Sequence, residues 1–267
     1  MDKAVILARG LGTRMRKADA TAELTDAEKA AADAGVKAMM PIGRPFLDYV
    51  LSGLADVGYR RVCLVIGPEH GQVREYYDRL GTRRVRIEFA IQPEPRGTAD
   101  ALASAEDFAA GEPVLAINGD GYYPPEALGA MRDLAGSGLA AFTRAGLLRG
   151  NIPAERLAKF ALVRTDEAGR LVGIVEKPDD EQMRSAGGSP RVSMNCWRFE
   201  ASIFEACRRI GPSPRGEWEL PLAVQYAMEH LGVVFRAVTI DAPVLDLSSR
   251  SDVAAVRAAL ADVEVRL

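Results

Sequence analysis

The first half of the chain alternates short apolar runs with amphipathic segments, and this pattern predicts strands that alternate with helices. The strand-like runs, rich in β-branched residues, cover 4–8, 61–66, 85–91, 114–118 and 139–142. Apolar positions at helical spacing predict helices over 46–57, 69–80, 98–109 and 124–134. Gly58 and Gly81 are expected to end the first two helices, and Thr98 to cap the third. Such alternation favours parallel crossovers and a sheet with helices on both faces.

The second half departs from this alternation. Two strand-like runs, 160–164 and 171–176, flank a polar turn and predict a β-hairpin. The later elements are expected as strands over 192–199 and 233–240 and as helices over 201–209, 218–230 and 252–263. No linker or repeat divides the chain. We therefore predict one α/β domain over 1–267 with a Rossmann-like open, mostly parallel sheet, helices on both faces, and added β-strands in the second half.

Residues 17–35 form a segment rich in Ala, Asp and Glu that predicts a helical insertion. Thr25 and Glu28 have the spacing of a capping box, and Gly35 is placed to end the helix. Two interpretations stay open for this insertion. It is either a solvated surface excursion or a lid over a ligand held by the segments on either side of it.

Composition limits the classes of protein that this chain can belong to. Hydrophobic residues make up 48% and charged residues 27%, as in ordinary folded proteins. The apolar runs are too short to span a bilayer, and residues 1–3 lead into a strand without a signal-peptide pattern. A net charge of −3 gives no basic footprint for nucleic acid. Three cysteines without CxxC spacing favour a reducing compartment, so we expect a cytoplasmic protein with neither membrane nor nucleic acid as a partner.

The strongest chemical signal is the turn that follows the first predicted strand. This turn contains Gly10 and Gly12, followed by Thr13 and Arg14. Glycine lets backbone amides approach a phosphate closely, and an arginine fork adds bidentate positive charge. The dinucleotide-binding fingerprint needs a third glycine where Met15 stands, and no GK[ST] motif occurs. Taken alone, the turn remains compatible with an ordinary strand-to-helix connection.

The whole stretch 4–16 resembles the signature L-A-A-G-x-G-T-R-[LM] of the sugar-1-phosphate nucleotidyltransferases, with Arg9 where that family usually has alanine. Residues 36–45 resemble the family's P-K-P-[ML]-x-P-[IV]-x-G-[KR]-P stretch, although Val36 and Ala38 replace its two prolines. Further matches follow in the family's order at 92–101, 118–120, 176–178 and 245–252. In the last of these, W-x-D-[IV]-G-T-P-x-D, Ser248 and Ser249 replace Gly-Thr. The matches run through nearly the whole chain.

This resemblance implies a role for each matched position. Nucleotide-binding residues are expected at Ala8, Gly10, Gly12, Thr13, Gln92, Gly97 and Thr98, mainly in a nucleotide-binding half, 1–145. Sugar-phosphate contacts are expected at Glu176, Lys177, Asn195 and Glu217, mainly in the other half, 146–267. The catalytic residues would be Arg14, Lys37 and Lys177, and the ligands of Mg²⁺ would be Asp120 and Asp246. The matches at Asn195 and Glu217 are the looser ones, and a structural role stays open for both.

The implied reaction joins a nucleoside triphosphate to a sugar 1-phosphate and releases pyrophosphate. The nucleophile is a phosphate oxygen that is already ionised at neutral pH, so no general base is needed. This agrees with a chain that has only two histidines. Gln92 with Gly97 would suit uracil or thymine, which slightly favours UTP or dTTP.

Other functions stay open at this point. A non-catalytic domain of the same fold could bind a nucleotide or sugar phosphate, and a related enzyme could use a non-sugar phosphate as acceptor. A nicotinamide dehydrogenase is disfavoured by the missing third glycine. A homo-oligomer is compatible with the sequence, which does not fix the oligomeric state.

Overall fold

A computed structural model describes residues 1–176, 178–179, 181–182 and 190–267. The strands are β1 Lys3–Leu7, β2 Arg61–Ile66, β3 Arg86–Ile91, β4 Val114–Asn118, β5 Gly121–Tyr122, β6 Gly138–Thr143, β7 Leu162–Thr165, β8 Leu171–Val175, β9 Arg191–Phe199, β10 Arg236–Ile240 and β11 Leu245–Asp246. The helices are α1 Thr13–Arg16, α2 Asp26–Ala34, α3 Phe46–Val57, α4 Gly71–Leu80, α5 Thr98–Ala103, α6 Glu106–Ala109, α7 Pro125–Asp133, α8 Arg144–Leu147, α9 Ala154–Leu157, α11 Ser202–Arg209, α12 Leu220–His230 and α13 Val253–Ala259, with 3-10 turns η1 Lys37–Met39 and η2 Arg250–Asp252.

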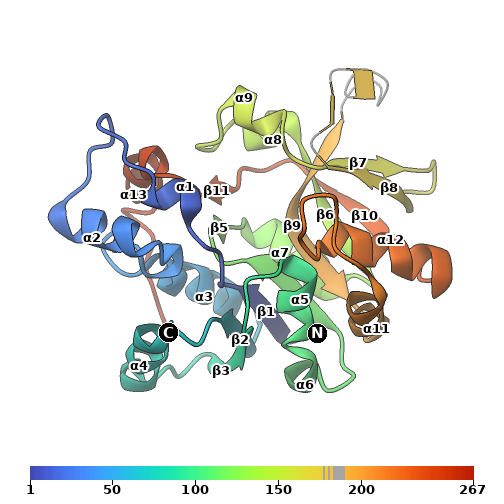
Figure 1. Cartoon of the computed structure of the whole chain (residues 1–267), viewed down its shortest axis with the longest axis horizontal. Helices are drawn as coiled ribbons and strands as arrows, with labels where there is room; N and C mark the ends of the chain where they lie inside the picture. The colour runs from blue at the N-terminus through green and yellow to red at the C-terminus, as the bar shows by residue number, and fades with distance from the viewer. Residues whose placement is uncertain (177, 180, 183–189) are drawn as a thin grey trace.

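A single twisted sheet forms the centre of the described part of the chain (Figure 1). Its strands follow the order β10-β6-β9-β4-β1-β2-β3, and the hairpin β7–β8 joins it through β9. Neighbours β4, β1, β2 and β3 are parallel, as are β6 and β10. Strand β9 is antiparallel to both β4 and β6, so it separates the two parallel groups. The expectation of an α/β fold with a mostly parallel sheet and added β-strands is confirmed.

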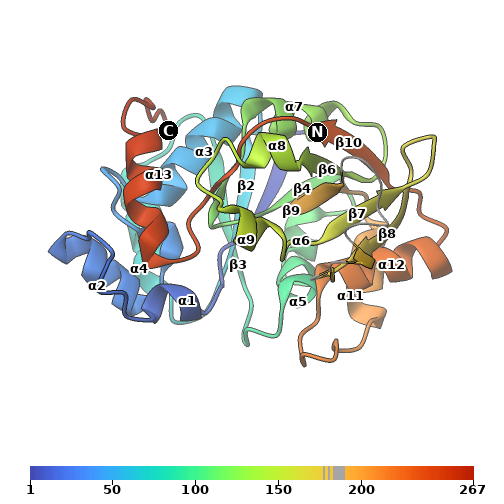
Figure 2. The same cartoon turned by 90° about the horizontal axis from the view of Figure 1, so that it is seen from above.

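Helices cover both faces of this sheet because its strands are apolar on both sides. In β1, Ala4 and Ile6 belong to one buried cluster, whereas Val5 belongs to the other. The first cluster includes residues of α3, α7 and α13, and the second includes residues of α5, α11 and α12. Figure 2 shows these two groups of helices on opposite sides of the sheet. The alternation of side chains along each strand thus builds two cores.

Most predicted elements are present with shifts at their ends, but the helix expected over 98–109 is divided into α5, Thr98–Ala103, and α6, Glu106–Ala109. Thr98 is not a cap, which corrects one expectation: α5 begins at Thr98 itself, and its N-cap is Gly97. The Thr98 hydroxyl instead accepts a hydrogen bond of 2.9 Å from the Leu220 amide. Trp218 is also tied down, since its amide donates to the Arg96 carbonyl and its carbonyl accepts from the Ala99 amide. These ties explain why α12 starts at Leu220 rather than at the predicted residue 218.

The stretch 17–35 contains the helix α2 with the cap that its sequence indicates. Thr25 and Glu28 form a reciprocal capping box, and Gly35 ends the helix with φ 74°. Arg257 of α13 donates to Glu28 at 2.6 Å, and Arg250 of η2 pairs with Asp33. Helix α2 is therefore held against the C-terminal end of the chain.

A two-stranded ladder lies apart from the main sheet and follows directly on β4. Strand β5 pairs antiparallel with β11, so that Gly121 faces Asp246. The Leu247 amide also donates to the Asp120 carbonyl at 2.8 Å. This ladder brings the end of β4 next to a segment from near the end of the chain.

Candidate functional site

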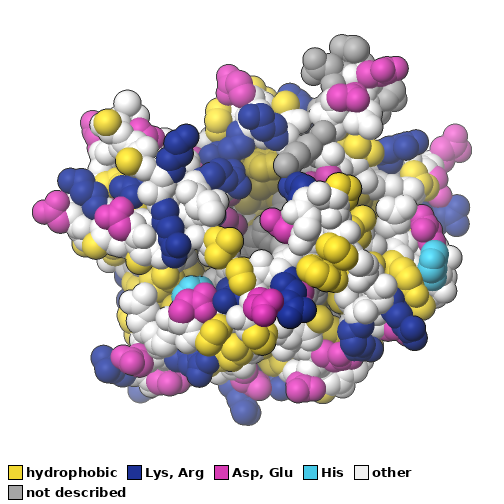
Figure 3. Space-filling view, viewed as in Figure 1, with side chains coloured by type: hydrophobic (Ala, Val, Ile, Leu, Met, Phe, Trp, Pro, Cys, Tyr) yellow, Lys and Arg dark blue, Asp and Glu magenta, His cyan; other side chains and the backbone are white. Residues whose placement is uncertain are grey.

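A cavity of about 370 Å³ opens where the parallel strands β1 and β4 end. The β1–α1 turn, η1, the start of α5 and the end of β4 contribute its walls. In open parallel sheets, ligands bind beyond the carboxyl ends of the strands, and this cavity lies there. Figure 3 shows the same face hollowed at its centre, with Lys and Arg side chains on the side of α1 and α2.

The two glycines of the β1–α1 turn are required for different reasons. Gly12 has φ 62°, and a Cβ there would meet the Gly35 carbonyl oxygen at 2.4 Å. It therefore has to be glycine for the fold itself. Gly10 has no positive φ, and a Cβ there would meet nothing within 4 Å. The fold does not need a glycine at this position, and Gly10 faces open space in the wall of the cavity.

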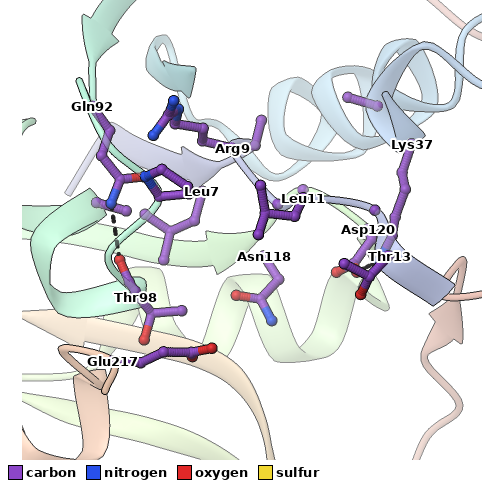
Figure 4. A pocket seen from close by; sticks show the side chains of 18 of the residues that line it. Leu7, Arg9, Leu11, Thr13, Lys37, Gln92, Thr98, Asn118, Asp120 and Glu217 are labelled. Carbon is purple, nitrogen blue, oxygen red and sulfur yellow. Dashed lines mark hydrogen bonds and ion pairs between the residues drawn. The ribbon is translucent and has the colours of Figure 1, made fainter. Parts of the chain in front are cut away.

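At one end of the cavity a lysine and a carboxylate from distant segments form an ion pair. The Lys37 ammonium, on η1, lies 2.8 Å from Asp120 Oδ2 at the end of β4. Their side chains are 15% and 24% exposed, so a ligand in the cavity could still reach both. Figure 4 shows these two side chains and Thr13 together at this end.

Asp246 lies beside Asp120, across the β5–β11 ladder, and is almost fully buried. Its Oδ1 accepts a hydrogen bond of 2.9 Å from the Ser248 hydroxyl. Its Oδ2 lies 3.3 Å from Arg156 Nη2, although neither atom has a hydrogen-bond partner among the described residues. Burial, together with the negative charge of Asp120, raises the pKa of Asp246 to about 6, while Arg156 lowers it. A carboxylate that is costly to ionise beside another carboxylate favours binding of a cation.

Gln92 and Gly97 define the opposite end of the cavity. The amide nitrogen of Gln92 donates to the Gly97 carbonyl at 3.1 Å and to Asp100 at 2.8 Å. Gly97 has φ 135°, and a Cβ there would lie 2.5 Å from the Trp218 carbonyl oxygen. This close approach holds the neighbouring Glu217 at the wall of the cavity.

Arg9 also lies at this end, near Gln92 (Figure 4). Its guanidinium donates two hydrogen bonds of 3.2 Å to Glu69, and its side chain is only 8% exposed. A Cβ on Gly67 would meet the Arg9 side chain at 2.4 Å, so this glycine makes room for the pair. Arg9, which departs from the family signature, thus lines the cavity and is held in place by Glu69.

The structure brings most of the predicted site residues to one place. Those that line the cavity are Ala8, Gly10, Gly12, Thr13, Arg14, Lys37, Gln92, Gly97, Thr98, Asp120 and Glu217. Asp246 is next to this group through the ladder to β5. Asn195, in β9 with φ 55°, and the exposed Glu176, after β8, are not among the lining residues. Lys177 lies outside the described residues.

The motifs in the sequence do not assign a role to three further residues at or beside the site. Asn118 lines the cavity just before Gly119 and Asp120, although the motif that contains it points to its aspartate alone. Asn151 and Arg156 contact Asp246 from a loop and a short helix. Nothing in the local sequence indicates these contacts, because they span about 90 residues of chain.

The carboxylates fit a divalent cation that also binds a ligand. Among the described residues, no group of three or more His, Cys, Asp or Glu side chains gathers as a metal site. Asp120 and Asp246 lie beside each other instead, and Asp246 Oδ2 is a buried oxygen to which no described residue donates a hydrogen bond. Mg²⁺ is commonly held by one or two carboxylates and completes its octahedron with water and phosphate oxygens.

Comparison with known proteins agrees with this geometry. A family model described as nucleotidyl transferase matches residues 3–242. UTP–glucose-1-phosphate uridylyltransferase AglF of Haloferax volcanii is 27% identical over 94% of this chain and 93% of that protein. A glucose-1-phosphate thymidylyltransferase of Actinoplanes sp. is 29% identical over 82% of this chain and 64% of that protein. A crystal structure of UDP-glucose pyrophosphorylase complexed with UDP-glucose has a TM-score of 0.73 at 17% identity, over 99% of this chain and 100% of that chain, and shows a shared fold.

Within the described residues, no helix combines the length and the apolarity that a membrane span requires.

Proposed function

The chain belongs to the nucleotidyl transferase family, and we propose that it transfers a nucleotidyl group from a nucleoside triphosphate to a sugar 1-phosphate, with Mg²⁺, and releases pyrophosphate. The observation that carries this proposal is one cavity at the end of β1 and β4. A glycine turn, a lysine and an aspartate line it, and a second aspartate lies beside them. That set matches the needs of a reaction between two anions.

The β1–α1 turn is proposed to bind the triphosphate. Gly10 supports this role because its missing side chain serves no purpose within the fold and leaves open space at the cavity wall. Backbone amides of such a turn can then approach phosphate oxygens directly. Thr13 adds a hydroxyl, and Arg14 adds positive charge where pyrophosphate would leave.

Asp120 and Asp246 are proposed to bind the divalent cation, and Lys37 to contact phosphate. When bound, Mg²⁺ would screen the repulsion between the attacking phosphate and the α-phosphate. Lys37 lies 2.8 Å from Asp120, so its ammonium neutralises the carboxylate before any ligand arrives. The pair keeps a positive group beside the site of displacement, where it can stabilise developing negative charge.

Gln92 is proposed to read the nucleobase. Both hydrogens of its side-chain amide are used by Gly97 and Asp100, which leaves its oxygen as an acceptor. An acceptor suits the N3–H group of uracil or thymine, so we propose UTP or dTTP as the donor. The names of the relatives from Haloferax and Actinoplanes, a uridylyltransferase and a thymidylyltransferase of glucose 1-phosphate, support the same bases and a hexose phosphate.

The sugar phosphate is proposed to bind near Glu217, on the side of the cavity formed by the second half of the chain. Glu176, Asn195 and Lys177 are proposed to complete this region, on the strength of the sequence resemblance. We further propose a cytoplasmic protein, which the three buried free cysteines support. Light scattering would test whether the protein forms a homo-oligomer in solution, a state that the sequence leaves open.

The metal role of Asp120 has a direct test. We expect Asp120→Asn to lower kcat by at least about 100-fold, because the carboxylate would no longer help to hold the ion at the α-phosphate. The matched control is Asp133→Asn, whose carboxylate is exposed and outside the cavity. Pyrophosphate release from five nucleoside triphosphates, each with a panel of sugar 1-phosphates, measures the effect with and without EDTA.

Each outcome of this assay has a stated meaning. Activity with UTP or dTTP that EDTA abolishes, and that only Asp120→Asn loses, supports the proposal. Nucleotide binding without pyrophosphate release for any pair would instead indicate a non-catalytic binding domain. Release with a phosphoamine but with no sugar phosphate would redirect the acceptor assignment.

A further inference from the structure

Asp246 lies on β11, a strand that is too short to fix the position of the aspartate by strand pairing alone. Strand β11 has two residues, and its partner β5 also has two. On its other side, the Asn151 side chain bonds the Asp246 backbone twice. Asn151 Oδ1 accepts from the Asp246 amide at 2.8 Å, and its Nδ2 donates to the Asp246 carbonyl at 2.8 Å. The Asn151 side-chain amide thus makes the two backbone hydrogen bonds that a third strand would otherwise make.

The segment that contains Asn151 also contacts the Asp246 carboxylate, through Arg156. Arg156, on α9, donates from Nη1 to both oxygens of Asp252 at 2.9 Å. Its Nη2 lies 3.3 Å from Asp246 Oδ2. The side chains of Arg156, Asp246 and Asp252 are 17%, 9% and 6% exposed, so water screens these charges weakly.

The two oxygens of Asp246 have different surroundings. Oδ1 accepts a hydrogen bond from the Ser248 hydroxyl, whereas Oδ2 has no hydrogen bond within the described part of the chain and lies 3.3 Å from the Arg156 guanidinium. An ion that binds Asp246 would therefore use Oδ2, the oxygen that Arg156 faces. Arg156 can leave this oxygen without losing its anchor, because both bonds to Asp252 come from Nη1.

We propose that Arg156 is a resident counter-cation of the metal site, which positions Asp246 in the metal-free protein and competes with the divalent ion for Oδ2. This inference rests on the proposed metal role of Asp120 and Asp246. With an ion bound, Arg156 Nη2 would leave Asp246, while Nη1 would keep its hydrogen bonds to Asp252. Arg156 therefore weakens metal affinity and keeps two neighbouring carboxylates from repelling each other when no ion is bound.

The test is a titration of metal-free protein with Mn²⁺ alone, in which electron paramagnetic resonance measures the concentration of the free ion. We expect Arg156→Gln to bind Mn²⁺ roughly tenfold or more tightly than the unaltered protein, since one buried positive charge next to the ion is gone. The matched control is Arg149→Gln, because Arg149 is also an arginine paired with an aspartate, Asp241, but is exposed. Its Mn²⁺ affinity should equal that of the unaltered protein.

Asp246→Asn separates this inference from the proposed function. Loss of Mn²⁺ binding in Asp246→Asn, together with tighter binding in Arg156→Gln, supports both. If Asp246→Asn binds Mn²⁺ normally, the metal assignment itself fails. If Asp246→Asn loses the ion but Arg156→Gln binds it equally or more weakly, only the competition is overturned. Absence of binding by both the unaltered protein and Arg156→Gln also overturns it, since removal of the competitor then exposes no site.

A second variant covers the case in which Arg156→Gln does not fold, as judged by circular dichroism. Arg156→Lys keeps a positive charge beside Asp252 but lacks the fork that reaches both aspartates. We expect it to bind Mn²⁺ more tightly than the unaltered protein, by a smaller factor than Arg156→Gln. Unchanged or weaker binding in Arg156→Lys would contradict the competition on its own.

Discussion

At the scale of single residues, the site depends on which glycines serve the fold and which leave space for a ligand. Gly12 and Gly97 both have positive φ. A Cβ atom at either position would lie within 2.5 Å of a backbone carbonyl oxygen of another residue. Gly10 meets neither condition. A signature motif therefore mixes glycines that the fold requires with glycines that face the cavity, and only the backbone geometry distinguishes them.

This distinction predicts opposite behaviour for two neighbouring alanine variants. Gly10→Ala should change the free energy of unfolding by less than about 0.5 kcal/mol yet weaken triphosphate binding roughly tenfold, because a methyl group would fill the space that faces the phosphates. Gly12→Ala should cost about 1–3 kcal/mol of stability, from its left-handed backbone and the contact with Gly35. Urea unfolding and calorimetric titration measure the two effects. Equal loss of stability in both variants would contradict this assignment.

At the scale of elements, helix α2 shows how a local signal and a distant contact reinforce each other. Its capping box satisfies backbone donors at the N-terminus of the helix. Arg257 of α13 then bonds the same Glu28. No residue of α2 lines the cavity. The helix is attached to the C-terminal helix at the point where its own cap is formed.

The pH dependence of stability should reveal this attachment. Burial raises the pKa of Glu28, but hydrogen bonds from Thr25 and Arg257 outweigh it, and the net pKa is lowered from 4.5. Glu28 therefore contributes stability that is present above its unfolded pKa and is lost as pH falls through the lower folded value. Glu28→Gln should lose less stability than the unaltered protein between about pH 5 and pH 3. The exposed Glu23→Gln serves as control in urea unfolding, and identical pH slopes for all three proteins would contradict the prediction.

At the scale of the whole molecule, the chain closes on itself around the site. The first strand and the last helix share one buried cluster, which includes Ile6 of β1 and Val256 of α13. The segment between them returns through β11, so Asp246 lies beside the end of β4. The C-terminal helix is thus part of the core that supports Asp246 rather than an appendage.

Truncation of Leu260 should test this role of the C-terminal helix. Leu260, the C-cap of α13, is 1% exposed, so Leu260→Ala should cost about 2–5 kcal/mol by leaving a cavity in the first core. Leu148 is 48% exposed, and Leu148→Ala should stay within about 0.5 kcal/mol of the unaltered protein. Thermal and urea unfolding of both variants measure the difference. A small effect at Leu260 would mean that α13 adds little to the core.

The sequence alone determined the alternating strands and helices of the first half, because apolar periodicity and glycine stops are local signals. It also indicated which residues would meet, from Gly10 and Lys37 to Asp120, because short motifs in a fixed order carry that information. The predictions for Thr98 and for the start of α12 were wrong. Hydrogen bonds between the segments around Thr98 and Trp218, which are distant in sequence, determine the local structure at both positions.

Only the tertiary structure decided how the second aspartate is held. Asn151 and Arg156 reach Asp246 across about 90 residues of chain. Side chains with no local pattern become neighbours only when the sheet and its ladder bring their backbones together. The raised pKa of Asp246 has the same origin, since burial and the nearby Asp120 exist only in the folded chain. Hydrophobic periodicity can be read from the order of residues in the sequence, whereas contacts and electrostatic interactions depend on distances in the folded structure.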